Sequence, residues 1–518
     1  MAIFYCLALW LEMAENWENP EATFVGLILL LVILATKINL WKFCSFIIFT
    51  TACFLYFNFP DVANHVNLII FANLIILITA SYYWLRRDRF INPEDLYQTL
   101  ASPLRVSLVA VYFWAGFHKL NTDFFNPYFS CSNSMFLGIV EMLTSTVLGI
   151  PTFLILGLIT GIFIKHILPE YAIAIIRNKS KQIISYLIIL GILSAVGYGI
   201  LLYLNLTNKI FPLFVLSTSI FVVLWEVVGG VVMLIPRYQL LMFCLSIFMH
   251  LVLAPIGFVD FGSLAFALWL TFIPANYYGC LQQQITLPWL NLKVGVISSY
   301  IVINIIGGLV SGFYYLTNFE FNINSIAGII FIISALIVLA PLVKQLCEKP
   351  DDWQGVTVIK TKIPWLTYGA IAILAIFAST SYLGLRTAGN FSMFSNLRTE
   401  GETSNHLLLG SNPLKIWNYQ EDTVKIIEID DKKAKVGHKY RPLKDHYLPV
   451  VEFKKLIYQW TKAGYTVPLV FEYGDRLYRT NNIVNDPTWQ TPNRTWSMKL
   501  LDFRIIQPDN GEPNYCRW

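Results

Sequence analysis

The chain has 518 residues, of which 56% are hydrophobic, 15% aromatic and 13% charged, and its net charge is +5. Its mean hydropathy of +0.58 is typical of a protein that crosses a membrane several times, and it excludes an ordinary soluble globule. The net charge is too small to predict a nucleic-acid partner, and the sequence contains no DNA- or RNA-binding motif.

The N-terminal segment is a short apolar run followed by acidic residues at positions 12, 15, 18 and 21. It lacks the basic start of a secretory signal, so we expect no cleaved signal peptide. Apolar windows long enough to cross a bilayer then follow one another as far as residue 384. They cover residues 22–37, 41–58, 66–85, 104–120, 136–165, 183–205, 211–235, 239–256, 259–276, 294–316, 324–346 and 364–384. We therefore predict an all-α polytopic membrane bundle of about 11–12 transmembrane helices over residues 1–384.

The fourth window ends in the stretch AVYFWAGFHKLNTDFF, residues 110–125, where titratable side chains occur at membrane depth. If the helix continues through His118, then Lys119 and Asp123 are four positions apart and share a face. Ionisable residues are costly inside a bilayer and are usually retained for function, so Lys119 is the leading candidate for a functional residue. The alternative is a snorkelling lysine, whose ammonium reaches the head groups without taking part in chemistry.

Two further titratable side chains lie inside apolar windows. Glu226, in WEVVGGVVMLIPR, has no partner in its own helix and needs one elsewhere, with Lys119 or a histidine as candidates. A structural hydrogen bond between helices would explain this glutamate equally well. His250, in FMHLVLAPIGFVDF, is a candidate for the same site. However, a lone histidine on an apolar helix is more often a core residue held by one hydrogen bond.

Residues 385–518 are rich in charge and contain no window that crosses a bilayer. Residues 385–410 form a juxtamembrane connector, expected either to cap a cavity over Lys119 or to be a plain linker. Its notable polar side chains are Asn396, Arg398, Glu400, Asn405 and His406. Residues 411–518 predict a small α+β extramembrane domain, with one helix that Gly464 ends. Its strands are expected at 414–419, 424–430, 467–474, 475–483 and 496–507.

The eight cysteines are scattered along the chain, and none of them forms a CxxC motif. Most lie in apolar runs, where cysteine behaves as a small hydrophobic residue. They predict neither a zinc site nor a disulfide framework. Because no cluster of histidine and cysteine offers ligands, no metal is expected.

The charges of the loops alternate along the predicted bundle. One set of loops carries most of the cations, and the positive-inside rule assigns this set to the cytoplasm. These cations are Lys37, Lys42, Arg86, Arg87, Arg89, Arg105, Lys165, Arg177, Lys179, Lys181, Arg237, Lys293, Lys344, Lys349, Lys360 and Lys362. Both termini and the C-terminal domain are then predicted to be non-cytoplasmic, on the same side as Lys119.

The stretch around Lys119 resembles the signature of the horizontally transferred transmembrane (HTTM) domain family, which includes the vitamin K-dependent gamma-glutamyl carboxylase. The family pattern has an aromatic pair, Ala-Gly, basic residues ending in lysine, then Leu, Asn or Asp, and a last Asp before an aromatic residue. The matching residues here are Tyr112, Phe113, Ala115, Gly116, His118, Lys119, Leu120, Asn121, Asp123 and Phe124. The resemblance is strongest over residues 104–126 and weaker over 221–275.

The resemblance implies an active site in which Lys119 is the base that deprotonates reduced vitamin K or another isoprenoid quinol. Oxygen then adds to the quinol, and the strong base so formed allows carboxylation of a carbon acid. Glu226 and His250 would polarise the cavity, with His118 and Asp123 beside them. The aromatic residues Tyr112, Phe113 and Trp114 would contact the quinone. His118 replaces a second lysine of the carboxylases, which leaves the mechanism open.

The resemblance does not cover the large luminal region with which the carboxylases hold their protein substrate. A small molecule, a lipid or a short peptide is therefore the expected substrate. The alternative function is a non-catalytic membrane receptor, lipid-binding or assembly protein that uses the outer domain for binding. In that case, replacement of Lys119 by arginine, which keeps charge and length, would be tolerated.

Overall fold

The computed structural model describes residues 2–145, 212–274, 353–430, 442–490 and 500–508 with short gaps, together with a few further residues that include Cys516. The predicted spans at 183–205 and 294–316 lie outside the described residues. Most of the span at 324–346 and the second half of the span at 136–165 lie outside them as well.

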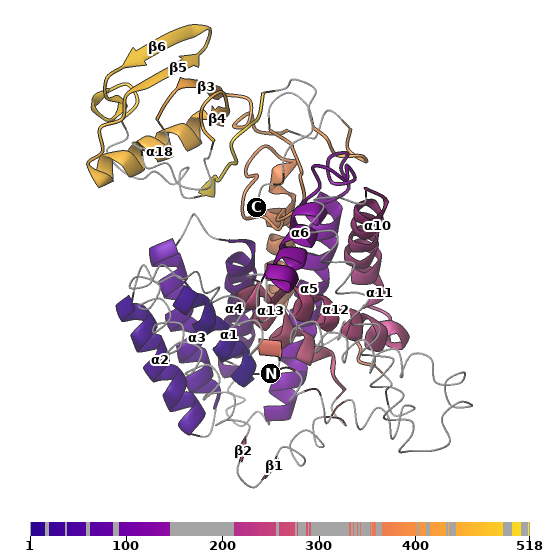
Figure 1. The fold of residues 1–518 in the computed structure, drawn as a ribbon. Helices are drawn as coiled ribbons and strands as arrows, with labels where there is room; N and C mark the ends of the chain where they lie inside the picture. The colour runs from indigo at the N-terminus through magenta and orange to yellow at the C-terminus, as the bar shows by residue number, and fades with distance from the viewer. Residues whose placement is uncertain are drawn as a thin grey trace.

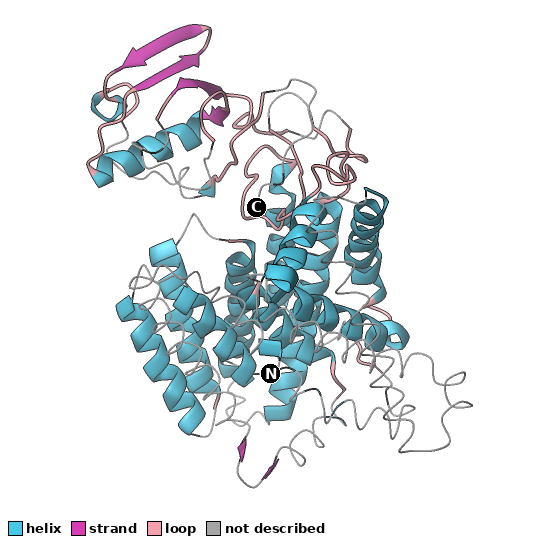
Figure 2. Ribbon diagram, viewed as in Figure 1, coloured by secondary structure: helices cyan, strands magenta, loops and turns pink. Residues whose placement is uncertain are grey.

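The membrane part is a bundle of apolar helices (Figures 1 and 2). A helix satisfies its own backbone hydrogen bonds, which is why long apolar runs take this form where water is absent. Among the described residues, four helices are long and apolar enough to cross a membrane, at Leu40–Phe57, Asn64–Tyr82, Thr99–His118 and Val215–Val232. Shorter apolar helices include Phe4–Met13, Glu21–Ile33, Val259–Phe272 and Thr367–Ser381.

The described helices of the bundle run as follows. They are α1 (Ala2–Glu15), α2 (Pro20–Ala35), α3 (Leu40–Cys53), the π-helix η1 (Phe54–Asn58), α4 (Asn64–Leu85), α5 (Pro93–His118), α6 (Cys131–Ser145), α10 (Pro212–Val223), the π-helix η3 (Leu224–Gly229), α11 (Gly230–Val232), η4 (Pro236–Tyr238), α12 (Gln239–Leu253), α13 (Val259–Trp269), η6 (Leu270–Phe272), α17 (Trp365–Ala378) and η8 (Ser379–Ser381). Two short strands, β1 (Thr286–Leu287) and β2 (Leu290–Asn291), pair at the end of the bundle opposite the C-terminal domain (Figure 1).

The N-terminal segment is a full helix, α1, where the sequence indicated only a short apolar start. It is buried between α2, α3 and α13, and the Tyr5 hydroxyl donates to Asn73 Oδ1 at 2.7 Å. This helix precedes the first predicted span. Figure 1 marks the N-terminus within the helical bundle and the C-terminus between the bundle and the C-terminal domain.

Helix α5 is the central element of the bundle and contacts α4, α13, α17 and η3. It begins eleven positions before the predicted start at residue 104, so Arg105 is part of a helix and not of a loop. Arg105 is buried, and its Nε donates to the carbonyl of Thr271 at 2.7 Å. The helix ends at His118, because Asn121 Nδ2 donates to the His118 carbonyl at 2.9 Å and its Oδ1 accepts from Phe124 N at 2.9 Å.

The close approach of α5 to η3 depends on Gly116. A β-carbon at this position would lie 2.7 Å from Glu226 Cβ and 2.9 Å from the backbone nitrogen of Val227. Such distances leave no room for any side chain. The glycine therefore lets the two backbones touch, and it brings the end of α5 level with Glu226.

The C-terminal domain contains an antiparallel four-stranded sheet in the order β4-β3-β5-β6, with one helix packed against it (Figures 1 and 2). Its elements are β3 (Thr423–Glu428), β4 (Tyr447–Pro449), α18 (Val450–Ala463), β5 (Leu469–Tyr473) and β6 (Arg476–Thr480). The predicted helix is confirmed, and it ends at Gly464, whose φ of 67° is left-handed. Phe453, Phe471 and Trp489 form the centre of the core.

Two of the predicted strands are wrong. In the described part of 414–419, Ile416 is 65% exposed and the segment bends instead of pairing with the sheet, and Trp417 N donates to the Leu383 carbonyl at 3.2 Å. The described part of 496–507 buries Phe503 and Ile505 but makes only one isolated bridge, between Ile506 and Tyr447. Its backbone bonds the connector instead, where Thr387 N donates to the Asp502 carbonyl at 2.9 Å.

A buried ionic network ties the connector to the C-terminal domain. Asp502 lies at its centre, with Arg386 Nη2 3.2 Å from Oδ2 and Lys455 Nζ 3.1 Å from Oδ1. Lys455 also lies 3.3 Å from Glu452 Oε1, so four charges compensate one another. Buried charges are tolerated when they are paired in this way. The network therefore fixes the domain against residues 386–388.

The structure corrects the expectation that no disulfide forms. Cys131, at the start of α6, is bonded to Cys516, which lies 385 positions away in the sequence. The sequence offers no local signal for this pairing, because only the fold brings the C-terminal tail to α6. The bond holds Cys516 against the start of α6, at the end of the bundle that faces the C-terminal domain (Figure 1).

We expect Gly116→Ala to destabilise the protein by about 1–3 kcal/mol, because the new methyl group forces α5 away from η3. Thermal unfolding in detergent will measure the loss. Gly369→Ala is the matched control, since a β-carbon at this helical glycine meets nothing within 4 Å. Equal effects of the two substitutions would show that the close approach at Gly116 is not needed.

We expect peptide mapping without reductant to recover Cys131 linked to Cys516. Cys516→Ser should lower stability by roughly 2–5 kcal/mol, because a long loop is no longer closed in the unfolded chain. Cys44→Ser removes a free cysteine and is the control. Recovery of both Cys131 and Cys516 as free thiols from protein exported to an oxidising compartment would contradict the assignment.

Candidate functional site

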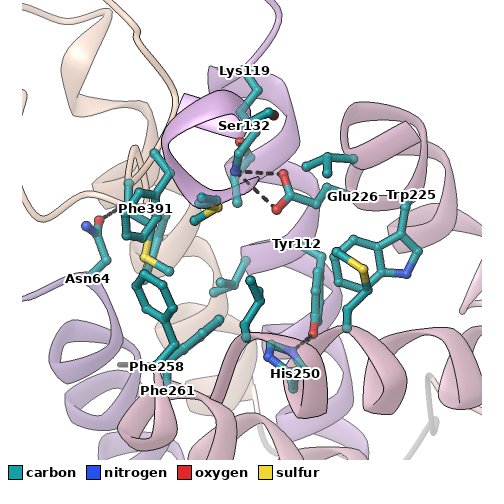
Figure 3. Close-up of a pocket in the computed structure, with 18 of the residues that line it drawn as sticks. Asn64, Tyr112, Lys119, Ser132, Trp225, Glu226, His250, Phe258, Phe261 and Phe391 are labelled. Atoms are coloured by element: carbon teal, nitrogen blue, oxygen red, sulfur yellow. Dashed lines mark hydrogen bonds and ion pairs between the residues drawn. The ribbon is translucent and has the colours of Figure 1, made fainter. Parts of the chain in front are cut away.

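A cavity of about 400 Å³ lies inside the bundle next to α5 (Figure 3). Its wall is largely apolar, and it comes from α4, α5, α6, α10, η3, α12, α13 and the connector. The polar side chains at its surface include Asn64, His65, Tyr112, Lys119, Ser132, Thr218, Glu226 and His250. Ligand pockets of this kind, apolar with a few convergent polar groups, are the usual form of a small-molecule site.

Lys119 and Glu226 form an ion pair at one end of the cavity (Figure 3). Lys119 Nζ lies 2.8 Å from Glu226 Oε2 and donates to Oε1 at 3.1 Å. It also donates to the Ala115 carbonyl at 3.3 Å. The two side chains are only 6% and 12% exposed, so the ammonium points into the protein. A snorkelling lysine would extend to the surface, and this one does not.

Glu226 is carried by the π-helix η3, between α10 and α11. A π-turn inserts one residue into a helix and changes the direction of the side chains that follow, and such turns are frequent at functional sites. Together with the glycine contact at Gly116, η3 places the glutamate beside the last turn of α5. The partner that the sequence required for Glu226 is therefore Lys119.

One face of α5 lines the cavity, with Leu108, Val111, Tyr112, Ala115 and Lys119 spaced as expected for a helix. Phe113 and Trp114, which were also predicted to contact a cofactor, are outside this face. They pack on the far side of α5, where both rings contact Phe117. Of the predicted aromatic trio, Tyr112 alone lines the cavity.

A second polar group at the cavity is the pair of Tyr112 and His250. The Tyr112 hydroxyl and His250 Nε2 share a hydrogen bond, and Trp269 Nε1 donates to the same hydroxyl at 3.1 Å. Both side chains are buried. This hydrogen bond gives His250 the single partner that a core histidine needs. His250 also lines the cavity (Figure 3).

His118 points away from the cavity that Lys119 enters. Its Nδ1 lies 2.7 Å from the hydroxyl of Tyr382, and the two rings stack with centroids 5.3 Å apart. It is fully buried beneath the connector. The structure thus separates the neighbouring residues His118 and Lys119, and it gives His118 contacts with the region after α17.

The expectation that Lys119 and Asp123 share a helical face is wrong. The helix has ended before Lys119, so residues 119–123 form a turn in which the spacing of four has no helical meaning. Asp123 Oδ2 accepts from Asn405 Nδ2 at 2.9 Å and its Oδ1 accepts from the Thr122 hydroxyl at 3.1 Å. Asp123 therefore anchors the connector and does not line the cavity.

The connector forms part of the cavity wall through Phe391, Met393 and Phe394. Phe391 and Phe394 have φ values of 66° and 52°, a left-handed backbone that bulky residues rarely adopt. Asn64 Oδ1 accepts from the backbone nitrogen of Phe391 and so ties this strained segment to α4. Strain held in place by surrounding bonds is common at ligand sites.

The rest of the connector is a buried polar layer over the end of α5. Asn121 and His406 form an isolated backbone bridge, and His406 Nε2 lies 3.0 Å from the Phe117 carbonyl. Burial lowers the pKa of His406, while the bond to that carbonyl opposes the shift. Asn396 Oδ1 accepts from the backbone nitrogen of Cys131 at 2.8 Å. These bonds make the connector an integral cover and not a loose linker.

Sequence reasoning missed His65, Ser132 and the connector residues that line the cavity. His65 directly follows Asn64 at the start of an apolar run, which is the type of signal that singled out Lys119. Ser132 carried no such signal. The phenylalanines of the connector were hidden among polar residues, and only their left-handed backbone shows their role.

The site contains the proton-carrying pair of Lys119 and Glu226, the hydrogen-bonded phenol of Tyr112 and an apolar volume between them. An amine paired with a carboxylate can accept and hold a proton from a weakly acidic hydroxyl group. The apolar wall excludes water, which strengthens the electrostatic effects inside. The site is therefore suited to proton abstraction from an apolar molecule.

No family model, characterised protein or solved structure matches this chain.

Proposed function

We propose that this chain is an HTTM-type integral membrane protein that uses Lys119 as the base for a carboxylase-type reaction on an isoprenoid quinol. The observation that carries the proposal is the ion pair of Lys119 and Glu226 at the edge of an apolar cavity. An apolar cavity suits many molecules. We choose a quinol among them because the residues around Lys119 resemble the HTTM family motif.

The role of the pair follows from its surroundings. Because the apolar wall excludes water, the pair acts on a bound hydroxyl group without competition from solvent. In its amine form Lys119 accepts the proton of a quinol hydroxyl at Nζ, and the Glu226 carboxylate accepts a hydrogen bond from the ammonium that forms. When bound, the quinol supplies the reaction with oxygen that produces a strong base.

The other lining residues orient the ring. Tyr112 and His250 present a hydrogen-bonding group away from the ion pair, and Phe258, Phe261 and Phe391 supply aromatic surface (Figure 3). A cavity of about 400 Å³ lies within the usual range for a small ligand. It suits a bicyclic ring with the first part of an isoprenoid chain. The expected carbon acid is a small molecule, a lipid or a short peptide.

The orientation of the C-terminal domain is part of the proposal. We place it outside the cytoplasm because the charges of the loops alternate along the chain. It follows a bundle that we propose to contain about 11–12 transmembrane helices. The Cys131–Cys516 bond supports this side, since disulfides form mainly in oxidising compartments. The extra helix α1 precedes the first predicted span, so we restrict the proposal on orientation to the C-terminal domain.

We expect the purified protein in nanodiscs to convert reduced menaquinone and oxygen to the quinone epoxide. Lys119→Met and Lys119→Arg should lower the rate by on the order of 100-fold or more, because neither side chain serves as the base. Mass spectrometry of the extracted quinone measures the product. Lys42→Ala, which changes a half-buried lysine of α3 that does not line the cavity, is the control. A folded wild-type protein that forms no epoxide would instead favour a receptor, lipid-binding or assembly role.

We expect Lys119→Met alone to lower stability by roughly 3–5 kcal/mol, because it leaves the Glu226 carboxylate buried without its cation. The double variant Lys119→Met/Glu226→Leu should regain much of this loss, although neither protein retains the base. Thermal unfolding of both variants and of Glu226→Leu completes the cycle. Simple additivity would show that the two side chains are not energetically coupled.

A further inference from the structure

Three side chains from three helices converge beside the cavity, on α1, α4 and α13. His65 Nε2 lies 3.1 Å from Glu12 Oε2 and 2.9 Å from Asp260 Oδ2. The ligand atoms of all three residues lie within 4.8 Å of one another. The side chains of His65, Glu12 and Asp260 are 16%, 4% and 8% exposed, so the cluster is inside the protein.

The geometry also fits a set of metal ligands. One imidazole nitrogen faces two carboxylates, and the single proton it carries is shared between them. Ligand atoms about 2.0–2.2 Å from one metal ion and at right angles to each other lie roughly 3 Å apart. The distances from His65 Nε2 to the two carboxylates have this value.

Charge also favours a divalent ion. An imidazolium brings one positive charge to the two carboxylates of Glu12 and Asp260, whereas a divalent cation brings two. Charges away from water are stable only when they are compensated. One nitrogen and two carboxylate ligands suit a borderline transition metal such as Zn²⁺, Mn²⁺ or Fe²⁺, because Mg²⁺ and Ca²⁺ prefer oxygen ligands alone.

The cluster meets the cavity at His65, which lines the cavity wall. Phe261, next to Asp260 in the sequence, packs near both His65 and His250, with ring centroids 6.3 Å and 5.1 Å away. Figure 3 shows Asn64, Phe258 and Phe261 on the opposite side of the cavity from Glu226. Three protein ligands leave coordination positions free for a ligand, as in catalytic metal sites.

We propose that Glu12, His65 and Asp260 bind one divalent transition-metal ion, whose open coordination positions face the cavity. The ion takes an oxyanion of the bound molecule and acts as a Lewis acid. The cavity then has two charged ends, the ion on α1, α4 and α13 and the ion pair of Lys119 and Glu226. The assignment stands whether or not the molecule is a quinol, and it replaces the expectation that no metal binds.

The test is metal binding by the full-length protein, stripped with chelator and then titrated with Zn²⁺ or Co²⁺. We expect wild type to bind one ion per chain, measured by elemental analysis after gel filtration, and to give Co²⁺ absorption bands that Zn²⁺ removes. Asp260→Asn and His65→Gln should weaken binding more than about tenfold. Glu21→Gln, an exposed acidic residue of α2, should bind as wild type does.

Two results would overturn the assignment. Wild type that binds no Zn²⁺ or Co²⁺ would show that the cluster is an imidazolium held between carboxylates. Metal retained equally by Asp260→Asn and His65→Gln would show that the ion lies elsewhere. If either variant fails to fold, the Co²⁺ spectrum of wild type and the variant Glu12→Gln still decide the question, because both report directly on the ligands.

Discussion

The ion pair of Lys119 and Glu226 is the interaction on which the candidate site depends. It lies between the end of α5 and a π-helix, and the two backbones come close enough only because position 116 is glycine. Separating the elements would leave two charges in an apolar interior, which costs several kcal/mol. The pair therefore stabilises the bundle and gives the cavity its reactive end, so structure and chemistry rest on the same residues.

The connector covers this site and joins it to the C-terminal domain. Phe391 and Phe394 reach the cavity, and the polar residues around them bond the ends of α4, α5 and α6. Asp502 joins the same segment to the domain through Arg386 and Lys455. Buried contacts therefore join the C-terminal domain to the segment that lines the cavity.

Sequence reasoning found part of the site and missed part of it for identifiable reasons. Lys119, Glu226 and His250 stood out because titratable groups in apolar windows are costly, and Tyr112 was predicted as an aromatic contact of a quinone. The cavity brings all four together. Phe113 lies on another face because the period of a helix, and not adjacency, decides what lines a cavity. The disulfide and the cluster around His65 join segments too distant in sequence to leave a local pattern.

The sequence by itself determined the apolar helices, the helix of the C-terminal domain with its glycine end, and the residues whose burial requires a partner. These properties follow from composition and local periodicity. Tertiary structure decided which partners meet. It ended α5 at His118, turned Asp123 toward Asn405 and placed Glu12, His65 and Asp260 together. Long-range contacts depend on how helices pack, and packing is a property of the whole chain.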